Sequence, residues 1–335
     1  MTLTENHLPA ILQEIEHNVG AISIGIVYFY TRMPSSPTSG EPMDTSQPNR
    51  DPDVCVITCA LTGVLADRRQ CTAVPYTPAE IGEEARRAYE AGASVVHIHA
   101  RNDDGSPSFS PATFARIKEE VRARCPILLN FSTGTMLEDV SDQCEYIRGS
   151  RPEIAALNMG TMNYAKYSPK RKGFVFDMVF PNTYEKIIKL LKAMNDAGVR
   201  PELECFDSGH TAGIAPLLDM GVLKPPLQFS FILNVLGGIP PLVESLQLQT
   251  KLIPAGSEWE VIGISTCQWR MIAAALVLGG NIRCGLEDNF YLPNGSMAKS
   301  NGELVEVAAR LVRDVGRTVA SVEDARVILG LGEAR

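Results

Sequence analysis

Two histidines one residue apart, His97 and His99, have the clearest chemical potential of any residues in this sequence, which contains five histidines in all. They lie in the apolar run 94–100, whose composition predicts a β-strand. Side chains alternate between the faces of a strand, so both imidazoles should point the same way, while Val96 and Ile98 point into the opposite layer. Two imidazoles on one face make half of a metal site. Imidazole has other uses, so the run alone leaves open a pair of hydrogen-bonded strand histidines.

The elements that must position this pair follow a regular order. Short runs rich in β-branched residues alternate with amphipathic helical patterns from residue 54 onward, which is typical of parallel βα units. The predicted strands are 54–60, 94–100, 127–132, 154–159, 202–207, 228–233, 260–264 and 281–286. The predicted helices include 78–91, 110–124, 183–197 and 266–278. A capping hydroxyl before a proline begins the first two helices, in Thr77-Pro78 and Ser110-Pro111.

Eight strands favour an α/β fold in the form of a closed (β/α)8 TIM barrel. An open doubly wound sheet remains an alternative, although such sheets usually carry a glycine-rich turn after the first strand and residues 61–64 read Leu-Thr-Gly-Val. We expect the barrel domain over 53–335. Residues 1–52 are expected to form an N-terminal extension and linker, because 34–40 is rich in proline and serine.

Polar residues follow the predicted strands where a TIM barrel places its active site, at their C-terminal ends. In chain order they are His97, His99 and Arg101; Asn130, Ser132 and Thr133; Asn158, Gly160 and Thr161; Glu204 and Asp207; and Arg283, Glu287 and Asp288. Single polar residues there are often helix caps or turns, and we favour that interpretation for Asp207 and Thr133. The histidine pair together with a carboxylate of 287–289 favours a metal site, since two imidazoles and one carboxylate leave open positions on a catalytic Zn²⁺.

Composition limits the partners. The 335 residues are 45% apolar and 21% charged, and the formal charge of −8 argues against general nucleic-acid binding, so an anionic cofactor needs local basic groups. Eight cysteines without C-x-x-C spacing predict buried thiols in a reducing cytoplasm. The apolar run 20–30 is shorter than the about 20 residues that span a bilayer, so no membrane partner is expected.

Several motifs in order resemble the β-keto acid cleavage enzymes over roughly residues 54 to 332. They are Pro75-Tyr76-Thr77-Pro78-Ala79-Glu80-Ile81, the segment 91–101 around the histidines, Asp103-Asp104-Gly105, Ser132-Thr133-Gly134, Gly285-Leu286-Glu287-Asp288-Asn289, and the segment 298–305. The resemblance implies a TIM barrel, a homotetramer, and Zn²⁺ held by His97, His99 and Glu287. It further implies Asp288 as the base, Arg283 as its partner, and Ser132 and Thr161 as substrate-contacting residues.

The family's reaction converts a β-keto acid and acetyl-CoA into acetoacetate and a new acyl-CoA. The residue types suit it, because a β-keto acid can chelate Zn²⁺ through its carboxylate and ketone oxygens while Asp288 removes the proton between them. Arg283, five residues earlier, can orient that carboxylate.

One departure bears on the substrate. In the family's best-known member an acidic residue follows the first strand, whereas this chain has Leu65 there. Leu65 cannot pair with an ammonium group, so we expect a keto acid without a positive charge, unless Asp67 or Glu204 substitutes. Two other interpretations stay open: a metal-dependent aldolase or lyase that does not use acetyl-CoA, and a non-catalytic binder of small molecules.

Overall fold

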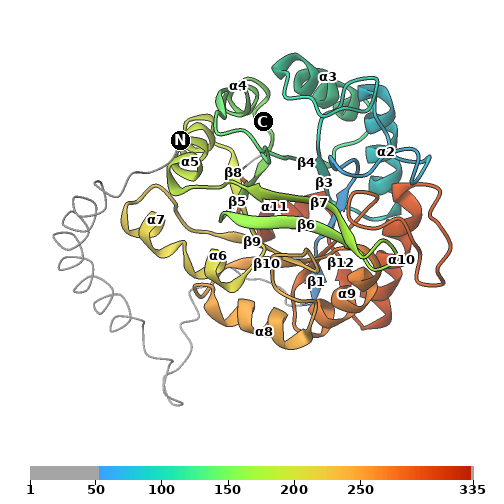
Figure 1. Cartoon of the computed structure of the whole chain (residues 1–335). Helices are drawn as coiled ribbons and strands as arrows, with labels where there is room; N and C mark the ends of the chain where they lie inside the picture. Colours follow the sequence, from blue (N-terminus) through green and yellow to red (C-terminus); the bar gives the residue numbers. More distant parts are fainter. Residues whose placement is uncertain (1–52, 333–335) are drawn as a thin grey trace. The chain divides into compact units, whose positions relative to one another are not determined.

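The computed structural model describes residues 53–332, so the expected extension and linker over 1–52 lies outside the described residues, as do 333–335. Eight parallel strands close into a barrel in the order β10-β11-β2-β3-β4-β5-β8-β9 (Figure 1). They are β2 (Ile57–Ala60), β3 (Val95–Ile98), β4 (Leu128–Phe131), β5 (Ile154–Asn158), β8 (Arg200–Cys205), β9 (Gln228–Leu233), β10 (Glu258–Gly263) and β11 (Asn281–Cys284). Each corresponds to one predicted strand, and the TIM-barrel prediction is confirmed.

Helices surround this barrel (Figure 1). The longer ones are α2 (Pro78–Ala91), α3 (Pro111–Arg122), α4 (Ser141–Ser150), α5 (Tyr184–Ala197), α8 (Val243–Leu252), α9 (Gln268–Val277) and α10 (Asn301–Asp314). Shorter ones are α6 (Ser208–Ala212), α7 (Ala215–Asp219), η1 (Ser265–Cys267) and α11 (Val322–Ile328). Thr77 caps α2, as predicted, and the structure adds a capping box with Glu80. The predicted cap of α3 is wrong in part: Ser110 occupies the N-cap position but makes no side-chain capping bond.

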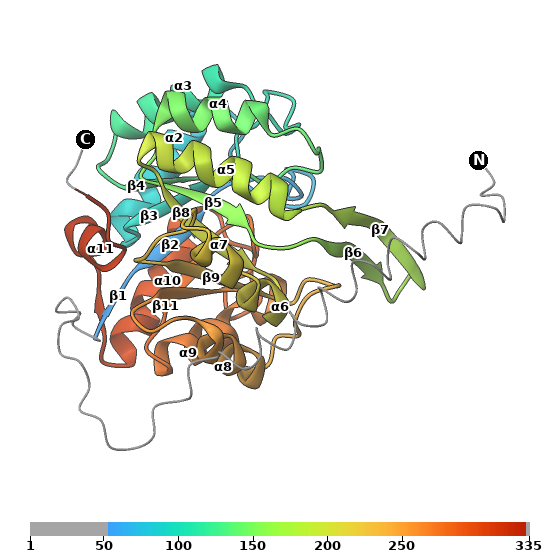
Figure 2. The same cartoon turned by 90° about the vertical axis from the view of Figure 1, so that its left-hand side faces the viewer.

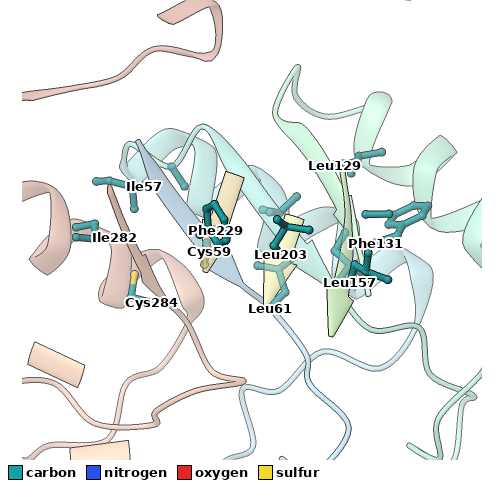
Figure 3. Packing of buried hydrophobic residues seen from close by; sticks show 14 of the residues in the cluster. Ile57, Cys59, Leu61, Leu129, Phe131, Leu157, Leu203, Phe229, Ile282 and Cys284 are labelled. Carbon is teal, nitrogen blue, oxygen red and sulfur yellow. The ribbon is translucent and has the colours of Figure 1, made fainter. Parts of the chain in front are cut away.

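The outward faces of the strands carry the main apolar core. Alternation sends one set of strand side chains toward the helices, and Figure 3 shows Ile57, Cys59, Leu129, Phe131 and Leu203 among them. Val96 and Ile98 belong to this outer layer, as the sequence predicts. The eight cysteines all lie within the described residues, are buried and form no disulfide, which confirms the expectation of buried thiols.

The barrel interior changes character along its axis. Near the N-terminal ends of the strands, Val56, Val95, Leu128 and Ile154 pack with residues of α11 in a separate apolar cluster. On every barrel strand except β5, which has Ala156 there, the next inward position is polar and buried: Thr58, His97, Asn130, Glu202, Ser230, Glu260 and Arg283. The apolar cluster therefore closes one end of the barrel and leaves polar chemistry for the other.

The sequence did not predict the antiparallel hairpin of β6 (Met162–Ser168) and β7 (Gly173–Phe180) between β5 and α5. Figure 2 shows it extending away from the end of the barrel. Its base packs on the barrel, because Met162 clusters with Phe206, Ile232 and Ile262. The first predicted strand also divides: β1 (Val54–Cys55) pairs with β12 (Thr318–Val319) outside the barrel. Among the described residues, no helix has the length and apolar character needed to cross a membrane.

Candidate metal and acid–base site

Three predicted ligand atoms converge at the C-terminal end of the barrel. Glu287 Oε1 lies 3.7 Å from His97 Nε2 and 3.5 Å from His99 Nε2. The two imidazole rings stand edge to face, with centroids 5.2 Å apart. A tetrahedral Zn²⁺ with bonds of about 2.0–2.1 Å would separate its ligands by about 3.3–3.4 Å, so the three atoms are close to the spacing that one ion requires.

The loop after β2 holds the histidines in place. The Thr62 hydroxyl accepts a hydrogen bond from the His99 backbone N–H and donates one to the His99 carbonyl, at 2.9 and 2.8 Å. Arg101, itself buried, donates to the carbonyls of Thr62, Gly63 and Ala66. The i, i+2 alternation that places the histidines inward thus continues to Arg101, which acts here as a clamp on the loop.

Two glycines let the loops that carry the site approach each other. Gly63 has φ +58°, and a Cβ there would lie 2.7 Å from Cγ of Glu287. Gly285 has φ +143°, and a Cβ there would lie 2.1 Å from the carbonyl oxygen of Ala60. The Glu287 N–H donates to that same carbonyl at 3.1 Å, which fixes the start of the Glu287 side chain.

Arg283 connects three carboxylates at the mouth of the barrel. Its Nε and Nη2 donate to the two oxygens of Asp288 at 2.9 and 3.0 Å, a bidentate pair. Nη2 also donates to Glu287 Oε1 at 2.6 Å, and Nη1 donates to Glu204 Oε1 at 3.4 Å. The arginine therefore links the proposed base to a proposed metal ligand.

Burial and charge separate the pKa values of these groups. Burial, with the nearby Glu287 charge, raises the pKa of Asp288 to about 6 against the opposing effect of Arg283. Burial and Glu202 raise the pKa of Glu204 to about 8. The pKa of Glu287 lies well below its usual range, because Arg283, His97 and His99 together outweigh burial. Burial and Arg283 hold the pKa of His97 well below its usual range, so this imidazole is neutral and able to bind a metal.

Buried ligand atoms that make no hydrogen bond also support a metal at this site. Within residues 53–332, both ring nitrogens of the buried His97 and Oε2 of Glu287 make no hydrogen bond. Buried polar groups without partners are costly, and a cation bound to Nε2 of His97 and to the Glu287 carboxylate would remove that cost for these two groups. Two imidazole nitrogens and one carboxylate oxygen are the protein ligands of one class of catalytic zinc site.

The other predicted site residues differ in placement. Ser132 is buried, and its hydroxyl accepts from the Gly134 N–H. The Thr161 hydroxyl accepts from the Asn182 N–H at 2.8 Å, where the hairpin leaves the barrel. Leu65 lies on the loop that Arg101 clamps, with 51% of its surface exposed. The alternatives to Leu65 are engaged elsewhere: Asp67 pairs with Arg69 on the surface, and Glu204 with Arg283.

Asp207 and Thr133 have the structural roles that the sequence favours. Asp207 is the N-cap of α6, where its side chain accepts from Gly209 N–H. The Thr133 hydroxyl donates to the Ala156 carbonyl at 2.5 Å.

Sequence reasoning missed a polar network deeper in the barrel. Ser230 donates to Glu202, and Asn130 Nδ2 also donates to Glu202. Ser230 Oγ lies 3.1 Å from Glu260 Oε1, and Thr58 donates to Glu260 Oε2 at 2.7 Å. The i, i+2 spacing of Glu202 and Glu204 was the available signal, since it places both on the inward face of one strand.

Comparison with known proteins identifies the family. The sequence profile of the beta-keto acid cleavage enzymes matches residues 54–331. The chain belongs to this family. A 3-keto-5-aminohexanoate cleavage enzyme of Fusobacterium nucleatum is 37% identical over 277 residues, which are 82% of this chain and 97% of that protein. A 3-oxoadipate:acetyl-CoA acetyltransferase of Cupriavidus necator is 34% identical over 281 residues, 83% of this chain and 95% of that protein. Family membership confirms the prediction that the chain is an enzyme.

Solved structures agree on the fold. The apo structure of ObcA aligns with a TM-score of 0.66 at 20% identity, and the alignment covers 78% of this chain and 66% of that one. At this level of identity the likeness shows the shared barrel alone.

Proposed function

We propose that this chain is a zinc-dependent enzyme that condenses a β-keto acid with acetyl-CoA and releases acetoacetate and a new acyl-CoA. The observation that carries the proposal is the convergence of His97, His99 and Glu287 beside the Arg283–Asp288 pair, in a member of the β-keto acid cleavage enzyme family. Acetyl-CoA as cosubstrate is supported by the names of two relatives, the 3-oxoadipate:acetyl-CoA acetyltransferase and a 3,5-dioxohexanoate:acetyl-CoA acetone transferase of Paraburkholderia graminis, 31% identical.

The chain's own residues divide the chemistry between them. A zinc ion bound by the three ligands would supply a Lewis acid for the carboxylate and ketone oxygens of the keto acid. Asp288 then takes the proton from the carbon between those groups, and its bidentate pair with Arg283 fixes the direction of its oxygens. Ser132 and Thr161 lie on the loops after β4 and β5 and would contact the substrate.

Carbon–carbon bond exchange follows proton removal. The carbanion formed attacks the carbonyl carbon of the acetyl thioester and expels the CoA thiolate. The thiolate adds to the original ketone carbon. Retro-Claisen cleavage then releases the new acyl-CoA and the carbanion of acetoacetate, to which Asp288 returns the proton that it took in the first step. This sequence needs no covalent enzyme intermediate, which suits a chain whose cysteines are all buried.

We propose a substrate without a positive charge beyond its reacting end. Leu65 offers no anion, and Asp67 and Glu204 already have cationic partners. Phe206, Ile232 and Ile262 form an apolar cluster with the base of the hairpin. Burying an ammonium group beside such side chains is unfavourable without a paired charge.

A panel of β-keto acids, neutral, anionic and amino-substituted, tests the activity when each is incubated with and without acetyl-CoA. The proposal expects acetoacetate only with acetyl-CoA, in a fixed ratio to a new acyl-CoA, and fastest with a neutral acid. Cleavage that proceeds equally without acetyl-CoA identifies the aldolase or lyase alternative. Binding without turnover across the panel identifies the non-catalytic alternative.

The metal is tested by removing one ligand. His99→Ala should lose most bound zinc and nearly all turnover, because an imidazole nitrogen is replaced by a methyl group. Metal analysis of the purified variant measures the first effect independently of the second. Full zinc occupancy would reject the ligand assignment.

Assembly and location extend the proposal. We expect a homotetramer, and exposed apolar side chains on the hairpin support a subunit contact there: Tyr167, Phe174, Val175 and Val179. Sedimentation velocity measures the assembly. We also expect a cytoplasmic protein, which the eight buried cysteines without a disulfide support.

A further inference from the structure

A chain of hydrogen bonds between buried side chains ends beside His97, which the proposed function makes a zinc ligand. Its members are Glu260, Ser230, Glu202 and Asn130. Asn130 and His97 are direct partners in the register of β3 and β4, so their inward side chains lie side by side. A carboxylate oxygen of Glu202 lies within 4.8 Å of a ring nitrogen of His97. Asn130, His97 and Glu202 face the inside of a closed barrel, and all three are fully buried.

The number of protons available determines which group donates each hydrogen bond in this chain. Ser230 Oγ lies within hydrogen-bonding distance of both Glu202 Oε1 and Glu260 Oε1, but a hydroxyl has one proton. One of the two carboxyl groups must therefore carry a proton. Burial and Glu202 raise the pKa of Glu260 well above its usual range, so Glu260 is the neutral acid that donates to Ser230. Ser230 then donates its one proton to Glu202 Oε1.

Glu202 fixes the orientation of the Asn130 amide. The Asn130 group that faces Glu202 Oε2 is the NH₂ group, which donates to it. The Asn130 oxygen is consequently directed elsewhere, and it is buried without a hydrogen bond in the described range. An acceptor without a donor thus lies next to the ring of His97.

His97 has the matching requirement. If Nε2, which faces Glu287, binds the metal, Nδ1 must carry a proton, and Nδ1 is also buried without a partner within residues 53–332. Metal-binding histidines usually donate their second N–H to a carbonyl or carboxylate, which sets the ring orientation. We propose that Asn130, held by Glu202, is the positioning residue of His97 and accepts its Nδ1–H when zinc is bound.

This inference rests on the proposed metal site, and zinc affinity tests it without an activity assay. Apoprotein is titrated with zinc against a chromophoric chelator for the wild type, Asn130→Ala, Glu202→Ala and Glu202→Gln. Asn130→Ala and Glu202→Ala should bind zinc about 10–100-fold more weakly, the usual effect of losing such a partner. Glu202→Gln should rescue most of this loss, because its amide oxygen still accepts from Asn130.

Asn281→Ala is the matched control. Asn281 is also a buried barrel asparagine, and its side chain accepts from Val56 N–H and donates to Glu258, away from the histidines. Its removal should lower the melting temperature and leave zinc affinity unchanged. If Asn130→Ala fails to fold, the imidazole N–H resonances of the zinc-loaded wild type decide the question. A His97 N–H protected from exchange with solvent is expected.

The outcomes are distinct. A wild type that binds no zinc contradicts the metal site and the proposed function with it. Wild-type affinity in Asn130→Ala, or a rapidly exchanging His97 N–H, overturns this inference alone. Loss of stoichiometric zinc in Glu202→Gln also overturns it, since Glu202 would then be a metal ligand itself.

Discussion

Replacing Asp288 by asparagine separates proton removal from metal binding. The side chain keeps its size and one acceptor oxygen for Arg283, whose Nε and Nη2 lie 2.9 and 3.0 Å from the carboxylate. Glu287 keeps its own contact with Arg283 at 2.6 Å, so the ligand set should remain in place. The substitution removes the ability to take a proton, the negative charge and one of the two hydrogen bonds from Arg283.

The size of the effect follows from the role. A positioned general base contributes about 10²–10⁴ in rate. At about 1.36 kcal/mol per tenfold change, this is a barrier increase of about 2.7–5.4 kcal/mol. Folding should suffer less, because losing one charge-assisted hydrogen bond costs about 1.5–3 kcal/mol and repulsion between Asp288 and Glu287 is relieved at the same time.

Three measurements make the test complete: zinc per protomer, acetoacetate formation at saturating substrates, and hydrogen–deuterium exchange at the carbon between ketone and carboxylate without acetyl-CoA. Asp288→Asn should keep zinc and lose both rates together. Asp207→Asn is the control, since Asp207 follows β8 at the same end of the barrel but caps α6. Unchanged exchange in a zinc-loaded Asp288→Asn would refute the assignment and direct attention to Glu204.

Three further changes test the site and the fold. Gly63→Ala should lose zinc and activity, because its Cβ would lie 2.7 Å from Glu287 Cγ; Gly316→Ala, also at positive φ but with open space around its Cβ, should change only the melting temperature. Leu65→Glu should shift the kcat/KM ratio of a 5-amino keto acid to its unsubstituted counterpart by about 1–3 kcal/mol in favour of the amine, and an unmoved ratio means that specificity is set elsewhere. Glu80→Gln should lower the melting temperature at pH 7 but not below pH 2. Backbone N–H groups and an arginine outweigh burial and lower the pKa of Glu80 in the folded state to about 2. The ionised Glu80 carboxylate therefore stabilises the fold above about pH 4.5, and this contribution is lost as the pH falls through 2.

The parts of the fold that depend only on neighbouring residues could be predicted from the sequence. The alternation around His97 and His99 predicted their shared face, and the Thr77-Pro78 pair predicted the start of α2. The eight barrel strands followed from apolar runs, because each strand must bury one whole face against helices. The hairpin escaped prediction because its strands are half exposed and pair with each other, apart from one bridge between Ala165 and Leu236.

Contacts between distant segments were beyond sequence reasoning. Asn301 N–H donates to Glu84 and its amide to the Leu61 carbonyl, across 217 and 240 residues. Arg283 reaches Glu204 across 79 residues. Spacing along the chain contains no information about such pairs, since they depend on which strands become neighbours after the barrel closes. Family resemblance supplied the roles of single residues, and the structure supplied the partners that hold them.

The distribution of polarity across the barrel explains how one fold can hold so costly a site. Buried carboxylates such as Glu202, Glu260 and Asp288 destabilise a folded chain relative to apolar side chains of similar size. The stabilising burial lies elsewhere, on the outward faces of the strands and in the cluster that α11 closes at the opposite end. Closure of the sheet then fixes the inward side chains through backbone hydrogen bonds on both sides of every strand. The metal ligands and the base can therefore be held in an unfavourable arrangement by a frame that does not depend on them, and substitutions in the inner polar layer should alter chemistry more than folding.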